Sequence, residues 1–134
     1  MSLDSFDDLL NAARQQAQPQ RLLFVFTGAE LPGDASPSQR TAFDSGQGGA
    51  LAPLMCADKT PEELQGFEAL VSESEQFGQA WAIVFVAGLS GKGGVAPTSA
   101  QAEAPLQTMV ESIKAGKIAT YVPFNREGQP VNLR

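Results

Sequence analysis

The stretch of sequence best suited to chemistry is Gly88–Ser99, which reads "GLSGKGGVAPTS". It follows the continuously apolar segment "WAIVFVAGL" and precedes an amphipathic one, so it joins a predicted strand to a predicted helix. Glycine-rich loops in this setting bind phosphate groups, because their backbone N–H groups and a lysine point at one anion. The sequence therefore suggests a ligand site that includes Lys92, Gly93, Gly94 and Thr98.

The loop resembles the variant Walker A loop of the partitioning and nitrogenase-iron-protein ATPases, whose pattern is GKGGVGKTT or GKGGVGKST. This chain has Ala96-Pro97 where the pattern has Gly-Lys. The lysine that contacts the β- and γ-phosphates is therefore missing, and proline has no N–H to offer. We expect no ATPase activity. An anion-binding loop remains an alternative to a plain glycine-rich connection.

Polar residues also follow two of the other predicted strands. In open α/β sheets, ligands bind outside the carboxyl ends of the strands. We therefore expect these residues to converge with the two glycine-rich loops on one site. The alternative is that they are ordinary turn residues and that the loops contact a protein partner. The candidate set is Asp58, Lys59, Asn125, Arg126 and the loops 28–36 and 88–98.

Composition excludes several classes of chemistry. The chain has no histidine and one cysteine, so a Ser-His-Asp or Cys-His mechanism is absent and a zinc site is not expected. We predict no cofactor and no metal. The cysteine, Cys56, lies in an apolar strand, which predicts a buried and inert thiol.

The charge and hydropathy of the sequence argue against nucleic-acid binding, a membrane-spanning segment and a secretory signal. Nine basic and fifteen acidic residues give a net charge of −6, without the basic stripe that nucleic-acid binding requires. No apolar run approaches the roughly 18 residues needed to cross a membrane. The start, "MSLDSFDDLL", lacks the basic and apolar regions of a secretory signal. We expect a cytoplasmic protein with a protein partner or a small anionic ligand.

Hydrophobic periodicity and capping residues predict alternating helices and strands. A helix face is formed by Phe6, Leu9, Leu10 and Ala13. A second helix begins at Thr60, and a third has its regular part from about Glu103 because Pro105 disfavours an earlier start. The predicted strands are "RLLFVF", "ALAPLMCA", "WAIVFVAGL" and "KIATYVPF", with a short helix at 36–45 and a fifth strand at 129–133.

The two halves of the chain have the same plan. A shift of 60 residues places Leu23 on Ile83, Gly28 on Gly88 and Pro37 on Pro97. We interpret this as an internal duplication of an αβαβ unit, with pseudo-repeats at 1–59 and 60–126. The fold prediction is a single α/β domain over residues 1–134. It has a mixed or parallel sheet of four to five strands covered by helices, with the apolar strands 22–27 and 82–87 central and the proline-bearing strands outside them.

The whole chain resembles a group of short proteobacterial proteins that carry the label "ribonucleotide reductase subunit alpha". The similar stretches are "FDDLL", "RLLFVF", "GGALAPLMC", "IVFVA", "APTS", "EAPLQ" and "YVPF". A catalytic subunit of that reductase needs a radical cysteine and a redox cysteine pair, whereas this chain has one cysteine. The resemblance therefore implies an accessory protein and no reductase activity.

From the residues, we favour a non-enzymatic binding or interaction protein that uses the loops 28–36 and 88–98. The alternative is a small ligand- or anion-handling enzyme with its site at the carboxyl ends of the strands. The two hypotheses differ in one geometric expectation. The enzyme requires Lys92, Asp58, Asn125 and Arg126 to lie in one pocket.

Overall fold

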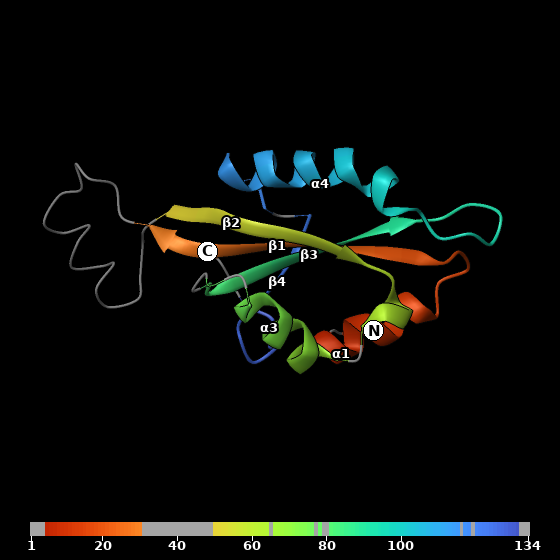
Figure 1. Ribbon diagram of the computed structural model, residues 1–134, viewed down its shortest axis with the longest axis horizontal. Helices are drawn as coiled ribbons and strands as arrows, with labels where there is room; N and C mark the ends of the chain where they lie inside the picture. The colour runs from red at the N-terminus through yellow and green to blue at the C-terminus, as the bar shows by residue number, and fades with distance from the viewer. Residues whose placement is uncertain are drawn as a thin grey trace, which may run out of the picture.

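A computed structural model describes residues 5–30, 50–64, 66–76, 78, 81–115, 117–118 and 120–131. The predicted helix at 36–45 lies outside these residues, as do residues 31–36 of the first loop and the end of the predicted strand at 129–133. In chain order the elements are α1 (Phe6–Arg14), β1 (Gln20–Glu30), β2 (Ala50–Lys59), the 3-10 turn η1 (Pro61–Glu63), α3 (Phe67–Glu75), β3 (Ile83–Ser90), α4 (Ser99–Lys114) and β4 (Val122–Phe124) (Figure 1).

The strands form one sheet in the order β2-β1-β3-β4, and each neighbouring pair is antiparallel. The prediction of a mixed or parallel α/β sheet with right-handed crossovers is therefore wrong, and the fold is α+β. The prediction took each strand–helix–strand unit to be a parallel crossover and took the continuously apolar strands as a sign of helix cover. Such strands report only that both faces of the sheet are covered, and helices cover both faces of this antiparallel sheet.

The positions of the strands agree with the prediction, although their directions do not. β1 and β3 are central, and the proline-bearing strands β2 and β4 lie outside them. Val25 and Phe85, which the 60-residue shift relates, are direct partners across β1 and β3. The internal duplication itself stays a prediction.

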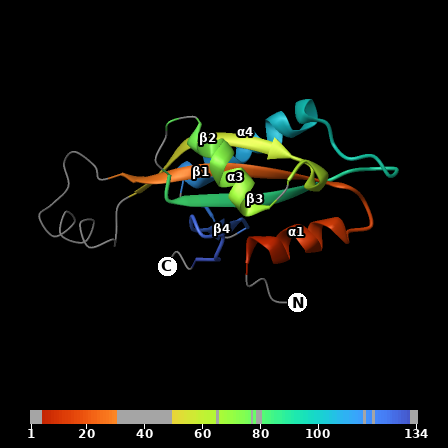
Figure 2. The same cartoon turned by 60° about the horizontal axis from the view of Figure 1, so that its bottom comes forward.

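Two hydrophobic clusters lie on opposite faces of the sheet. α1 and α3 cover one face and α4 covers the other (Figures 1 and 2). On the first face, the Phe6 ring lies 5.1 Å from the Phe67 ring and 5.5 Å from the Phe124 ring, which joins both helices to the outer strand β4. On the second face, Met109 and Ile113 of α4 pack with Val25 and Phe85.

Local signals in the sequence set the helix ends only in part. The Ser5 hydroxyl caps α1 by accepting from the Asp8 N–H. The helix predicted from Thr60 is instead divided into η1 and α3 by Gly66, whose φ of 130° no helix adopts. α4 begins at Ser99 and contains Pro105, so the later start predicted for it is wrong. The capping box of Thr98 and Gln101 stabilises this first turn.

Candidate functional site

The strand directions divide the predicted site between two ends of the sheet. Asp58 and Lys59 end β2 and face the start of β1, and Gly88 and Ser90 of β3 lie against the same stretch of β1. Asn125 and Arg126 follow β4, whose last residue pairs with Val84 near the opposite end of β3. Antiparallel neighbours send their carboxyl ends in opposite directions, so the expected convergence in one pocket does not occur.

Arg126 and Asn125 have structural partners at their own end. The Arg126 guanidinium lies 4.7 Å from the centre of the Trp81 ring and donates to the Trp81 carbonyl oxygen at 3.2 Å. Glu75 lies 3.9 Å from the same guanidinium. The Asn125 side-chain oxygen accepts from the backbone N–H groups of Glu127 and Gln129, as in an Asx turn. These contacts hold the turn after β4 against α3.

The loop after β3 is a tight hairpin turn. Lys92 and Val95 exchange two backbone hydrogen bonds of 3.1 Å, with Gly93 and Gly94 at φ 60° and 77° between them. A two-residue turn with both φ values positive matches the twist of its flanking strands and favours glycine. A Cβ at Gly91 would overlap the Val95 carbonyl oxygen, so that position needs glycine for space.

This geometry weakens the anion-loop alternative. The N–H groups of Lys92 and Val95 bind within the turn, and the Gly94 N–H donates to the Gln18 side-chain oxygen at 2.9 Å. At the start of α4, the Thr98 N–H donates to the Gln101 side chain, which completes the capping box. Most of the amides that would hold a phosphate therefore already have partners inside the chain.

A partly buried ion pair fixes the segment that follows the hairpin. The Arg21 guanidinium lies 2.7 Å from Asp58, and their side chains are 14% and 17% exposed. The Arg21 Nε–H also donates to the Pro97 carbonyl oxygen at 2.6 Å, and the Asp58 carboxylate accepts from the Ser99 hydroxyl at 3.0 Å. Asp58 therefore ties β1, β2 and the start of α4 together. The neighbouring Lys59 lies 2.9 Å from Glu73 of α3.

The outer edge of β3 is only partly covered. Gly91, which continues β3, donates its N–H to Pro19 just before β1, so the odd-numbered residues of β3 direct their backbone groups to β1. The even-numbered residues face outward. β4 pairs with Val84 and Val86, but among the described residues no backbone group pairs with the outward N–H and C=O of Gly88 and Ser90. We call Ala87–Ser90 the open edge.

A turn in the chain before β4 keeps this edge open. The Tyr121 N–H donates to the Ile118 carbonyl oxygen at 3.1 Å, and both side chains pack against the cluster under α4. Extending β4 toward Gly88 would require Thr120 to join the sheet and Ile118 to leave that cluster. The three-residue length of β4 therefore follows from how the chain before it is packed.

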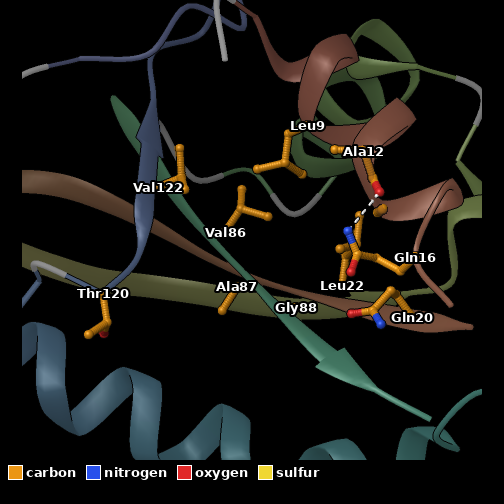
Figure 3. A pocket seen from close by; sticks show the side chains of 11 residues that line it. Leu9, Ala12, Gln16, Gln20, Leu22, Val86, Ala87, Gly88, Thr120 and Val122 are labelled. Carbon is orange, nitrogen blue, oxygen red and sulfur yellow. Dashed lines mark hydrogen bonds between the residues drawn. The ribbon is translucent and has the colours of Figure 1, made fainter. Parts of the chain in front are cut away.

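Two cavities flank the open edge, one on each face of the sheet. The α1 pocket, of about 320 Å³, lies between α1, β3 and β4 (Figure 3), and its lining includes no charged residue. The hairpin pocket, of about 390 Å³, lies on the α4 side. The α1 pocket is lined by Leu9, Ala12, Ala13, Gln16, Gln20, Leu22, Val86, Ala87, Gly88, Thr120 and Val122, and the hairpin pocket by Leu89, Ser90, Gly91, Lys92, Val95, Ala96, Pro97 and Gln101.

One polar side chain on the floor of the α1 pocket is held firmly. Gln20 is 9% exposed, and its amide N–H groups donate to the Ser90 hydroxyl and to the Gln18 carbonyl oxygen. Its side-chain oxygen lies next to Gly88, where a Cβ would approach within 3.2 Å. The Gln20 side chain therefore lies beside Gly88 and Ser90 in the α1 pocket, and it does not bind their outward backbone N–H and C=O groups.

Reactive side chains are poorly placed for catalysis. Cys56 is exposed on β2, so the predicted burial of this residue is wrong. The pKa of its thiol is raised by partial burial and, less strongly, by the Asp58 carboxylate, which disfavours the reactive thiolate. The described residues contain no group of three or more side chains that could hold a metal ion.

Sequence reasoning found the 88–98 loop but missed the open edge and the residues of α1 and β1 beside it. The "KGGV" stretch could have identified the hairpin, because two glycines between strand residues favour such a turn. Nothing local could have identified the edge, since it depends on where β4 begins.

No family model, curated protein or solved structure matches this chain. None of the helices in the described part of the chain is both long and apolar enough to cross a membrane.

Proposed function

We propose that this chain is a non-enzymatic interaction protein that binds a polypeptide partner at the open edge and the 88–98 segment. The observation that carries the proposal is the uncovered backbone of Gly88 and Ser90 between two pockets. Exposed strand edges pair readily with other chains, and proteins normally block them with charge, proline, bulges or covering segments.

The other outer edges of the sheet carry such blocks. β2 has an irregularity opposite Phe26 and Thr27 and contains Pro53, which has no N–H to donate. β4 is covered by the segment after it, where the Val131 N–H donates to the Pro123 carbonyl oxygen. The open edge reads Ala-Gly-Leu-Ser and has neither charge nor proline. This contrast supports the open edge as a binding site.

The test is a selection of nine-residue peptides displayed on phage against the full chain. The selected peptides are then titrated while backbone amide NMR signals are followed. We expect shifts to concentrate at residues 86–97 and at the α1 residues of the α1 pocket. The proposal fails if no peptide binds above background, or if the shifts map to β2 or to the Asn125 turn.

The anion-handling alternative is tested with the same spectra. Inorganic phosphate and ATP are titrated into the full chain, with the Lys92→Ala variant as control. Saturable shifts at Gly93 and Thr98 that are lost in this variant would favour a small-ligand site over a peptide site. We expect none, because three of the loop amides already have partners within the chain.

A further inference from the structure

We infer that the partner segment binds by strand addition, as an extended peptide that pairs antiparallel with the open edge and places an uncharged side chain in the α1 pocket. This inference rests on the proposed function and specifies its chemistry. In strand addition the backbone hydrogen bonds provide affinity, and pockets for alternate side chains provide specificity. Both requirements are met at the same four residues of β3.

The hydrogen-bonding pattern fixes the register. Gly88 and Ser90 each direct an N–H and a C=O away from β1. In an antiparallel pair, one residue exchanges both bonds with one partner residue, so two residues of the incoming segment would pair with Gly88 and Ser90. β4 already occupies the next two positions, Val84 and Val86, in this way. The incoming segment would continue the line of β4 along the same edge.

The available length is short. β4 and Thr120 limit the edge on one side, and the hairpin at Lys92–Val95 limits it on the other. About four residues fit between these limits, at about 3.4 Å per residue. A longer partner would have to bend away from the sheet at both ends.

The two pockets fit the alternation of a strand. Successive side chains of an extended segment point to opposite faces of the sheet. One set would enter the α1 pocket and the other the hairpin pocket, which lie on opposite faces beside the open edge. A single extended segment can therefore fill both pockets, whereas a helix presents one face to one groove.

The lining of the α1 pocket selects against charge. Leu9, Leu22 and Val86 provide apolar contacts, and Gln16 and Gln20 provide its amide groups. Burying an unpaired charge in such a lining is strongly unfavourable. The side chain that enters this pocket is expected to be uncharged and of moderate size. The hairpin pocket contains Lys92 and tolerates a polar or acidic residue.

The experiment uses a peptide from the phage selection and compares Gly88→Pro with Gly88→Ala. Both variants add a Cβ at the same place, but only proline removes the outward N–H, which β1 does not use. We expect binding of the labelled peptide, followed by fluorescence anisotropy, to be about tenfold weaker for Gly88→Pro than for Gly88→Ala, because a backbone bond is lost and the ring meets the incoming strand.

Hydrogen exchange in the unsubstituted chain gives a second readout that does not depend on how a variant folds. In the free chain, the amides of Ala87 and Leu89 should exchange slowly and those of Gly88 and Ser90 quickly. Adding the peptide should slow exchange at Gly88 and Ser90 and leave the other two unchanged.

The outcomes separate the two proposals. If the peptide shifts the signals of residues 86–97 and of the α1 pocket, but binds the two variants equally and leaves exchange at Gly88 and Ser90 unaffected, it contacts the side chains around the open edge and not its backbone. The strand-addition mode is then wrong and the proposed function stands. If no peptide binds, the proposed function fails and the mode fails with it. A peptide that binds as a helix, seen by circular dichroism, also overturns the mode.

Discussion

Arg21 offers the sharpest test of how the hairpin segment is held beside the open edge. Its guanidinium joins Asp58 at 2.7 Å and the Pro97 carbonyl oxygen at 2.6 Å. Replacing it by methionine keeps the apolar stem of the side chain and removes both interactions. Asp58 would then keep the Ser99 hydroxyl as its remaining contact in this cluster.

The expected loss follows from burial. Removing one partner of a fully buried pair costs about 3–5 kcal/mol, because the other charge stays buried without compensation. Here the Arg21 and Asp58 side chains are 14% and 17% exposed, so water can reach the Asp58 carboxylate after Arg21 is replaced. We expect Arg21→Met to lower the free energy of unfolding by about 2–3 kcal/mol, which includes about 1 kcal/mol for the bond to Pro97.

The assay is urea unfolding of a double-mutant cycle with Arg21→Met, Asp58→Asn and both together. A direct interaction predicts a coupling energy of about 1–2 kcal/mol between the two sites. The control is Lys114→Met, which removes a 3.9 Å pair with Glu111 whose side chains are both more than half exposed. That substitution should change stability little. Additivity of the Arg21 and Asp58 substitutions within about 0.5 kcal/mol would refute the assigned ion pair.

Three further substitutions or conditions have defined outcomes. Phe6→Ala should cost about 3–5 kcal/mol in urea unfolding, because a fully buried ring between α1 and the sheet is lost; a loss under about 1 kcal/mol would contradict this packing. Gly91→Ala should destabilise the chain more than Gly93→Ala, as measured by thermal unfolding of both variants. A Cβ at position 91 would collide with the Val95 backbone, whereas a Cβ at position 93 would meet only the strain of a positive φ in open space. Alkylation of Cys56 by iodoacetamide should be slow at neutral pH and accelerate only above the ordinary thiol pKa, because partial burial and the Asp58 carboxylate raise the pKa of this thiol. Rapid labelling at pH 7 would contradict the raised pKa.

The parts of the fold that depend on neighbouring residues were predictable. α1 follows from the spacing of Phe6 and Leu10, with the Ser5 hydroxyl capping its first turn. α4 was predicted as a helix, but the capping box at Thr98 and Gln101 outweighs Pro105, so α4 starts earlier than predicted. Each of these signals acts within one or two helical turns. The same holds for the turn at Asn125, whose side chain binds the backbone two and four residues on.

Strand direction was not predictable in this way, because it depends on contacts between distant segments. Whether β1 runs parallel or antiparallel to β3 changes neither the apolar content of the strands nor their burial. The error carried over to the site, since only parallel strands would have brought Asp58 and Arg126 to one edge. Cys56 was misjudged for a different reason: its apolar neighbours in an outer strand do not show whether its own side chain is covered.

A pH effect near Thr60 would show whether the titratable groups in this region serve structure rather than catalysis. The pKa of Glu63 is lowered mainly by the Thr60 backbone N–H, which donates to its carboxylate at 2.9 Å. A carboxyl group with a lowered folded-state pKa contributes stability above its unfolded pKa and loses it as pH falls through the folded value. Glu63→Gln should therefore reduce the stability difference between pH 7 and acidic pH, measured by urea unfolding. The effect is small because the side chain is 53% exposed.

The direction of that shift also bears on function. A lowered pKa makes Glu63 a weaker base, and a raised pKa makes Cys56 a poorer nucleophile at neutral pH, so both shifts oppose catalysis. If Glu63→Gln left the acid dependence of stability unchanged, the capping role would be wrong and a different role for this carboxylate would need to be sought. If the dependence falls as expected, the Glu63 carboxylate serves to hold the turn at Thr60 and, like the Arg21–Asp58 pair, has a structural role.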